Sequence, residues 1–200
     1  MGDETDAKLA EYKAQLRLEE VHGHVLELGA GLGPNLKLFG PNVTAYTAVE
    51  PNPGFHERLK AQAAAQLPAD AKFSLLLASE DGTIALPSDS VDHVVVTLVL
   101  CSVPHLEATV AEILRVLKPH GTFRFLEHVR APQDHAVLRT TQQVVDASRL
   151  WALFGDGCEV NRDTLRVIQR TMGWEVEAMA VMSSFGPPFV RPIVFGKATK

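Results

Sequence analysis

Two neighbouring stretches decide the fold: His24-Val25-Leu26-Glu27-Leu28-Gly29-Ala30-Gly31-Leu32-Gly33 and Thr44-Ala45-Tyr46-Thr47-Ala48-Val49-Glu50. The first predicts a buried strand that leads into a glycine-rich turn and the start of a helix. The second predicts another strand, which ends in an acid. A strand, a glycine turn, a helix and a second strand in this order build the nucleotide-type cofactor sites of α/β proteins.

The rest of the chain alternates between strand and helix patterns. We expect strands at residues 25–28, 42–49, 72–77, 91–98, 122–126, 175–182 and 192–198, and helices at 4–20, 33–39, 53–65, 106–117, 136–154 and 162–172. Residues 91–98 form a nearly continuous apolar run, which is typical of a strand covered on both faces. The alternation predicts a Rossmann-like, doubly wound α/β fold. We expect a mostly parallel seven-stranded sheet with an antiparallel closing strand.

Length and composition bound the class of protein. The 200 residues, 46% of them hydrophobic and 22% charged, suit a single domain spanning residues 1–200, with an N-terminal helical segment at 1–22. The net charge is −5, and no basic stripe is present. A nucleic-acid partner is therefore not expected, and a small molecule is the expected substrate. The oligomeric state cannot be derived from these features.

Cellular location follows from what the chain does not carry. No apolar run reaches the roughly 18 to 20 residues of a membrane helix, and the N-terminus lacks a signal-peptide pattern. Cys101 and Cys158 are the only cysteines, so a disulfide framework is not expected and a reducing compartment is favoured. We expect no membrane span and a cytoplasmic location; removal of an upstream anchor from the chain would leave membrane association open.

The glycine spacing separates two kinds of cofactor. A dinucleotide site has the pattern G-x-G-x-x-G, whereas this turn is G-x-G-x-G, with Pro34 where the third glycine would stand. Glu27, just before the first glycine, would repel a pyrophosphate but suits a cationic amino group. Glu50 can accept hydrogen bonds from both ribose hydroxyls. A phosphate-free, cationic cofactor such as S-adenosylmethionine meets these demands; a glycine turn without a ligand is the alternative.

These features resemble the class I S-adenosylmethionine-dependent methyltransferases. The resemblance also covers Val49-Glu50-Pro51-Asn52-Pro53, Asp89-Ser90-Val91-Asp92 and Glu112-Ile113-Leu114-Arg115-Val116-Leu117-Lys118-Pro119, although His120 replaces the first glycine of the usual continuation. A closer resemblance, to methyltransferase-like alkyl-thiol S-methyltransferases, is carried by segments at residues 49–53, 97–103, 127–129 and 154–158, and also by residues 190–192 and 195–196. Animal members of that group carry an apolar N-terminal membrane anchor, which is not found in this chain.

The resemblance implies a set of site residues at the carboxyl ends of the strands. The loop after the third strand usually frames the adenine; Ala78 stands where its acid would be, so Ser79 and Glu80 are the candidates, with a solvated acidic loop as the alternative. The complete expected cofactor set is Glu27, Gly29, Gly31, Gly33, Asn35, Glu50, Pro51, Ser79, Glu80, Thr97 and Leu98.

On the acceptor side, His128 at the end of the fifth strand is the candidate general base, because the usual pKa of histidine suits neutral pH. A structural histidine is an equal alternative. Methyl transfer from a sulfonium needs no protein nucleophile, so we expect Cys101 to serve packing. Aromatic residues are candidates for an apolar acceptor pocket or for the core: Trp151, Phe154, Phe185 and Phe189. The histidines show no metal-binding spacing, and no metal is expected.

The sequence thus predicts a methyltransferase that uses S-adenosylmethionine and releases S-adenosylhomocysteine. A small thiol, methylated by direct in-line displacement, is the leading acceptor. An oxygen or nitrogen acceptor in a small metabolite is the second hypothesis. A non-catalytic cofactor-binding domain is the third.

Overall fold

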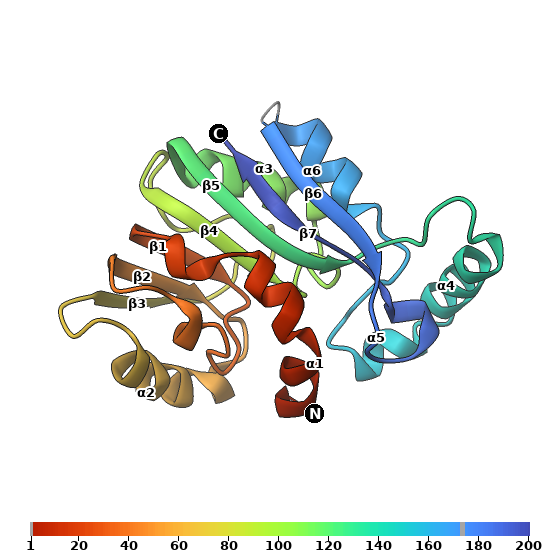
Figure 1. Cartoon of the computed structure of the whole chain (residues 1–200), viewed down its shortest axis with the longest axis horizontal. Coiled ribbons are helices and arrows are strands. Elements are labelled where there is room, and N and C mark those ends of the chain that lie inside the picture. The colour runs from red at the N-terminus through yellow and green to blue at the C-terminus, as the bar shows by residue number, and fades with distance from the viewer. Residues whose placement is uncertain (1, 173–174) are drawn as a thin grey trace.

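A seven-stranded sheet with strand order β3-β2-β1-β4-β5-β7-β6 organises the chain (Figure 1). The computed structural model describes residues 2–172 and 175–200. The strands are β1 (Gly23–Leu28), β2 (Val43–Val49), β3 (Lys72–Leu76), β4 (Val91–Thr97), β5 (Leu117–His128), β6 (Glu175–Met182) and β7 (Pro192–Thr199). Strands β1 to β5 pair in parallel, and β7 runs antiparallel to both β5 and β6. The predicted doubly wound sheet with its closing antiparallel strand is confirmed.

The order of the strands reverses between β1 and β4. Strand β1 pairs with β2 on one side and with β4 on the other, and the chain crosses the sheet to reach β4. In doubly wound sheets, ligands bind beyond the carboxyl ends of the strands at such a reversal. The glycine turn after β1 therefore lies at the expected place for a cofactor.

Helices cover both faces of the sheet and extend beyond one end of it. They are α1 (Gly2–Gln15), α2 (His56–Gln66), α3 (Leu106–Val116), α4 (Ala136–Ser148), α5 (Leu150–Phe154) and α6 (Thr164–Met172), with 3-10 turns η1 (Leu18–Glu20), η2 (Leu36–Leu38), η3 (Pro53–Phe55) and η4 (Pro188–Val190). Figure 1 shows α4 projecting beyond the ends of the strands. No helix in the described part of the chain is both long and apolar enough to cross a bilayer.

Two apolar cores lie on opposite faces of the sheet. Because side chains alternate along a strand, Val94 and Val96 pack with α3 and α6, whereas Val95 packs with α1 and α2. All three valines are fully buried. The continuous apolar run in β4 is thus explained, since both of its faces are covered.

The helix expected at residues 33–39 is wrong. The structure has only the 3-10 turn η2 there. Gly33 adopts a left-handed backbone with φ of 80°, and Phe39 is already extended ahead of Gly40-Pro41. The few residues between these two breaks leave no room for a longer helix.

The single helix expected at residues 136–154 is also wrong. Arg149 is left-handed, with φ of 58°, and divides the segment into α4 and α5. Nearby, Asp146 accepts hydrogen bonds from the backbone amides of Val160 at 2.9 Å and Asn161 at 2.8 Å. The end of α4 is thereby bonded to the loop before α6, and α5 leaves in a new direction.

Other element boundaries differ from expectation at their ends. The N-terminal helix expected at 4–20 ends at Gln15 and is followed by η1. Strand β5 begins at Leu117 rather than at residue 122, because Leu117 already pairs with Val91 across an irregularity in the β4–β5 ladder. His120 adopts a left-handed backbone, with φ of 66°. A histidine therefore takes the conformation that the usual glycine would supply.

Candidate active site

The turn after β1 places its glycines in the left-handed conformation. Gly29, Gly31 and Gly33 have φ of 62°, 56° and 80°. A Cβ added at Gly29 would stand 2.3 Å from Cγ2 of Val99, so this glycine lets the segment after β4 come close. A Cβ at Gly31 would meet no atom of the described residues within 4 Å. Gly31 thus borders open space, where a ligand can approach the backbone.

Glu50 joins this turn to the end of β2. Its side chain accepts a hydrogen bond from the backbone N–H of Gly31 on Oε2 and one from that of Asn52 on Oε1, each at 2.8 Å. Glu50 is only 4% exposed. Each oxygen retains a second lone-pair site, so the fixed carboxylate can still accept hydrogen bonds from a ligand.

Glu27 lies on the face of β1 that packs under α1 and α2. Its carboxylate accepts hydrogen bonds from Asn35 Nδ2 at 2.8 Å and from the Tyr46 hydroxyl at 2.5 Å. Burial raises the pKa of Glu27 to about 7, although these two bonds and the charge of Lys13 act in the opposite direction. The expected contact of Glu27 with a cofactor amine stays a prediction, since both oxygens already have protein partners.

Asn35 links Glu27 to the end of β4. Its Nδ2 donates a second hydrogen bond, at 2.9 Å, to Oγ1 of Thr97. The fold therefore brings together three residues expected in the site, from β1, from the turn and from β4. Asn35 Oδ1 is buried and has no hydrogen-bond partner among the described residues. An unpaired buried acceptor of this kind suits a donor from a ligand.

A cavity of about 330 Å³ opens beside the glycine turn. It contains four of the expected residues, Gly29, Pro51, Ser79 and Glu80. The other lining residues come from the end of β1, from the loops after β3 and β4, from α3 and from the loop before α6: Leu28, Ala78, Gly82, Thr83, Ile84, Val99, Ser102, Val103, Pro104, Thr109 and Asp156. Gly31, Gly33, Asn35, Glu50, Thr97 and Leu98 are not part of its lining.

Asp81, which is not among the expected site residues, organises the loop after β3. It accepts hydrogen bonds from Ser79 Oγ at 2.6 Å and from Thr83 at 3.0 Å (N) and 2.7 Å (Oγ1). These hydrogen bonds, of which the one from Ser79 has the largest effect, lower the pKa of Asp81 to about 2. In the sequence, the S-x-D-x-T spacing indicates such a loop, because serine, aspartate and threonine side chains form local turns by hydrogen bonding to nearby backbone groups. The hydroxyl proton of Ser79 is thus directed at Asp81, and Glu80 is exposed.

His128 is buried at the end of β5. Its Nδ1 lies 2.7 Å from the carbonyl oxygen of Val190, and its ring packs 5.5 Å from that of Phe185. Because a carbonyl only accepts, Nδ1 carries the proton and Nε2 keeps its lone pair. Burial lowers the pKa of His128 to about 4. The imidazole is therefore neutral at physiological pH.

Comparison with known proteins identifies the family to which this site belongs. Residues 26–125 match the methyltransferase domain family. The chain is 34% identical over 176 residues to thiol S-methyltransferase TMT1A of Homo sapiens, which covers 88% of this chain and 70% of that protein. It is 36% identical over 180 residues to thiol S-methyltransferase TMT1B of Rattus norvegicus, with the same two shares. The chain belongs to the S-adenosylmethionine-dependent methyltransferases.

The fold of the methyltransferase agrees with this assignment. The crystal structure of an S-adenosylmethionine-dependent methyltransferase from Mesorhizobium loti superimposes with a TM-score of 0.66 over 98% of this chain and 99% of that one, at 19% identity. The residues present also fit the cofactor. Gly31 leaves space at the backbone, and Asn35 Oδ1 is a buried acceptor without a partner. An unpaired acceptor of this kind suits a ligand that carries an ammonium group.

The expected acceptor-side residues of the methyltransferase lie in different surroundings. Trp151 contacts Phe189 with ring centroids 5.0 Å apart, whereas Phe154 is 76% exposed. Cys101 and Cys158 are free and buried, and they pack in one apolar cluster with Val160 and Val190. The packing role expected of Cys101 fits its 1% exposure and the raised pKa of its thiol, which follows from contact with Cys158 and from burial.

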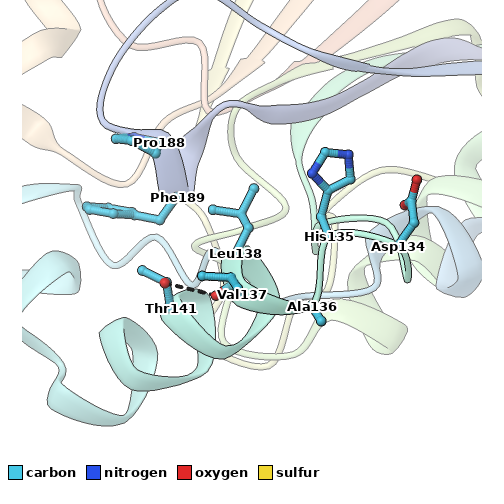
Figure 2. A pocket seen from close by; sticks show the side chains of 8 residues that line it. All are labelled: Asp134, His135, Ala136, Val137, Leu138, Thr141, Pro188 and Phe189. Atoms are coloured by element: carbon cyan, nitrogen blue, oxygen red, sulfur yellow. Dashed lines mark hydrogen bonds between the residues drawn. The ribbon is translucent and has the colours of Figure 1, made fainter.

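A larger hollow, of about 740 Å³, lies at the start of α4 (Figure 2). Its apolar lining includes Val137, Leu138 and Phe189, and Asp134 and His135 stand at one side. Of the four aromatic candidates for the acceptor pocket, it contains only Phe189. Among the described residues, no group of three or more histidine, cysteine or acidic side chains is arranged to hold a metal.

Replacing Glu50 with alanine tests whether this residue accepts hydrogen bonds from the ribose hydroxyls of the cofactor. We expect the dissociation constant of S-adenosylhomocysteine, measured by calorimetry, to rise by about 10- to 100-fold, because two hydrogen bonds to a charged acceptor are lost. Glu57→Ala is the control, since the side chain of Glu57 is 86% exposed in the next helix. Unchanged affinity in Glu50→Ala would remove this residue from the cofactor site.

Replacing Glu27 with glutamine tests how the buried carboxyl group changes the stability of the fold with pH. The folded protein holds the carboxyl proton more tightly than the unfolded chain, so the wild type loses stability as pH rises from about 4.5 to about 7. Glutamine does not titrate and escapes this loss. From pH 5 to pH 8, the stability of Glu27→Gln relative to wild type should therefore rise, by up to about 3 kcal/mol. Urea unfolding at both pH values measures this change.

The control for this experiment is Glu11→Gln, because Glu11 is exposed on α1. Its stability relative to wild type should stay nearly constant with pH. If Glu27→Gln behaves in the same way, the carboxyl of Glu27 ionises in the folded protein as easily as in the unfolded chain, and the assigned burial cost is incorrect.

Proposed function

We propose that this methyltransferase transfers the methyl group of S-adenosylmethionine to the sulfur of a small thiol. The observation that carries the proposal is the similarity to thiol S-methyltransferases, which extends over 88% of the chain at 34% identity and above. The match includes the acceptor side of the fold as well as the cofactor half, since it extends well beyond residues 26–125. Two free, buried cysteines suit a reducing compartment, and we place the enzyme in the cytoplasm on this basis.

Within this proposal, the cofactor lies across the carboxyl ends of β1, β2 and β3. The carboxylate of Glu50 receives the ribose hydroxyls, and the cavity beside Pro51, Ser79 and Glu80 receives the adenine. Asn35 Oδ1 accepts a hydrogen bond from the ammonium group, and Glu27 behind it supplies the compensating negative charge. Gly29, Gly31 and Gly33 keep the backbone free of side chains along this path, and Thr97 and Leu98 border its methyl end.

The reaction is a direct displacement. S-adenosylmethionine supplies a methyl group bonded to a cationic sulfur. A thiolate forms the new sulfur–carbon bond as the old one breaks, and the electron pair of the broken bond stays on the departing sulfur. The protein contributes by aligning donor and acceptor and by excluding water.

In this scheme the thiol loses its proton to water before methyl transfer. A cysteine-like thiol has a pKa of about 8.5, so a useful fraction is ionised near neutral pH. His128, with a pKa lowered to about 4, is a weak acceptor for that proton. Its bond to Val190 instead ties the end of β5 to η4.

A panel of acceptors tests the thiol assignment. Release of S-adenosylhomocysteine is measured with an alkyl thiol (2-mercaptoethanol), an aryl thiol (thiophenol), phenol and benzylamine, at one cofactor concentration. We expect turnover with the thiols to exceed turnover with phenol and benzylamine by at least tenfold. Turnover of phenol or benzylamine alone would assign an oxygen or nitrogen acceptor and contradict the proposal.

Replacing His128 with asparagine tests the general base. Asparagine retains a donor toward the carbonyl of Val190 but lacks the free Nε2 of the ring. We expect kcat with 2-mercaptoethanol to fall by less than about tenfold, because a group with a pKa near 4 gains little from taking a thiol proton. A loss above a hundredfold, in a variant with wild-type thermal stability, would make His128 the base.

A further inference from the structure

The segment at residues 98–103 forms one wall of the cofactor cavity. It follows β4 at the strand reversal, and its residues Val99, Ser102 and Val103 line the cavity. Leu98 begins the segment with a left-handed backbone, φ 58°, and donates its N–H to the carbonyl of Leu126 at 2.7 Å. The backbone therefore leaves the direction of β4 at Leu98, and the segment needs hydrogen bonds from other elements.

Glu127 supplies that support for the amide groups of the segment. Its side chain accepts hydrogen bonds from the backbone N–H of Val99 at 3.0 Å, of Leu100, and of Cys101 at 3.4 Å. Three successive N–H groups converging on one carboxylate form an anion-binding arrangement of the backbone. Glu127 itself is completely buried at the end of β5, next to His128.

Arg162 supplies the matching support for the carbonyl groups. Its Nη1 donates to the carbonyl oxygen of Leu100 at 2.9 Å and to that of Val103 at 2.6 Å. Its Nε pairs with Glu159 at 2.8 Å, and the backbone N–H of Glu159 donates to the carbonyl of Cys101 at 2.9 Å. Peptide groups of the segment are thus bonded from both sides.

We propose that Glu127 and Arg162 are positioning residues for methyl transfer, which hold residues 98–103 so that the donor methyl and the acceptor meet in line. Neither side chain lines the cavity, so both act through the backbone of this segment. The inference rests on the proposed function for the identity of the acceptor and for the place of the methyl group. The arrangement of the segment itself is independent of the acceptor.

The energetics support a positioning role for Glu127. Burial raises its pKa to about 7, against the effect of three backbone hydrogen bonds and of the Arg162 charge. A buried acid therefore costs the fold free energy, and an apolar residue would avoid that cost. What the acid provides in return is a fixed course for the peptide groups that border the site.

The test uses three variants and two matched controls in the full chain. Glu127→Gln keeps the shape but removes the charge, Glu127→Asp keeps the charge but shortens its reach, and Arg162→Lys removes the forked donor. Glu177→Gln is the control for a strand glutamate, since its side chain is 67% exposed. Arg149→Lys is the control for the arginine: Arg149 pairs with the same Glu159, is 74% exposed, and in the described part of the chain donates to no carbonyl of the segment.

The first readout is the amide hydrogen exchange of the segment, which needs no acceptor. In Glu127→Gln we expect the amides of Val99, Leu100 and Cys101 to exchange at least tenfold faster than in wild type, with those of β1 and β2 unchanged. Unchanged exchange in a folded Glu127→Gln would overturn the proposal.

The second readout separates catalysis from cofactor binding. With 2-mercaptoethanol we expect kcat to fall at least tenfold in Glu127→Gln and Arg162→Lys, while the Kd of S-adenosylhomocysteine rises less than fivefold. Glu127→Asp should retain more kcat than Glu127→Gln, and both controls should stay within twofold of wild type. In-line displacement requires closer alignment than binding does, so misplacement costs rate first.

The outcomes remain distinct if a variant folds poorly or if the acceptor is different. Should Glu127→Gln fail to fold, Glu127→Asp and Arg162→Lys decide, and a wild-type kcat in both would overturn the proposal. A rise in Kd as large as the fall in kcat would assign the two residues to cofactor binding instead. A wild-type protein that methylates no thiol would reject the proposed acceptor, while the exchange measurement would still test the segment.

Discussion

The hydrogen bond from the backbone N–H of Gly31 to the carboxylate of Glu50 joins the two elements on which the site depends. It requires a left-handed turn after β1, which the glycines permit, and a buried acid at the end of β2. Strand β1 stands next to both β2 and β4, so the turn also receives Val99 of the segment after β4 against Gly29. Moving either residue would disturb the ends of three neighbouring strands.

Much of the fold follows from local patterns, and the exceptions have local causes. The apolar run at residues 91–98 predicts a central strand, and two covered faces confirm it. The helix at 33–39 fails because its length is limited by left-handed Gly33 and by Gly40-Pro41. The break at Arg149 lies beside Asp146, which bonds to a loop 14 and 15 residues later in the chain, and a periodic apolar pattern carries no information about such a contact.

The sequence predicts which strand ends carry the candidate residues, but it predicts the orientation of their side chains only in part. Glu50 and Gly31 meet as neighbouring strand ends should. The side chain of Glu27 points into the layer under α1, because it lies on the same face of β1 as Val25. Both faces of β1 are covered, so the alternation of residues does not show which way this side chain points. Glu127 is next to the predicted His128, yet its role depends on amides nearly thirty residues earlier in the chain, at 99–101.

An acid and an arginine together hold the backbone at each of two walls of the cavity. Glu112 accepts from the N–H of Ile84 at 2.9 Å, and its partner Arg115 donates to the carbonyl of Ile84 at 2.8 Å. Glu127 and Arg162 do the same for residues 99–103. The difference lies in burial: Glu112 has a lowered pKa through Arg115, whereas burial raises that of Glu127. The loop after β3 is therefore held by a half-buried ion pair. The segment after β4 is held by a carboxylate that is completely buried, and this restricts the movement of its peptide groups.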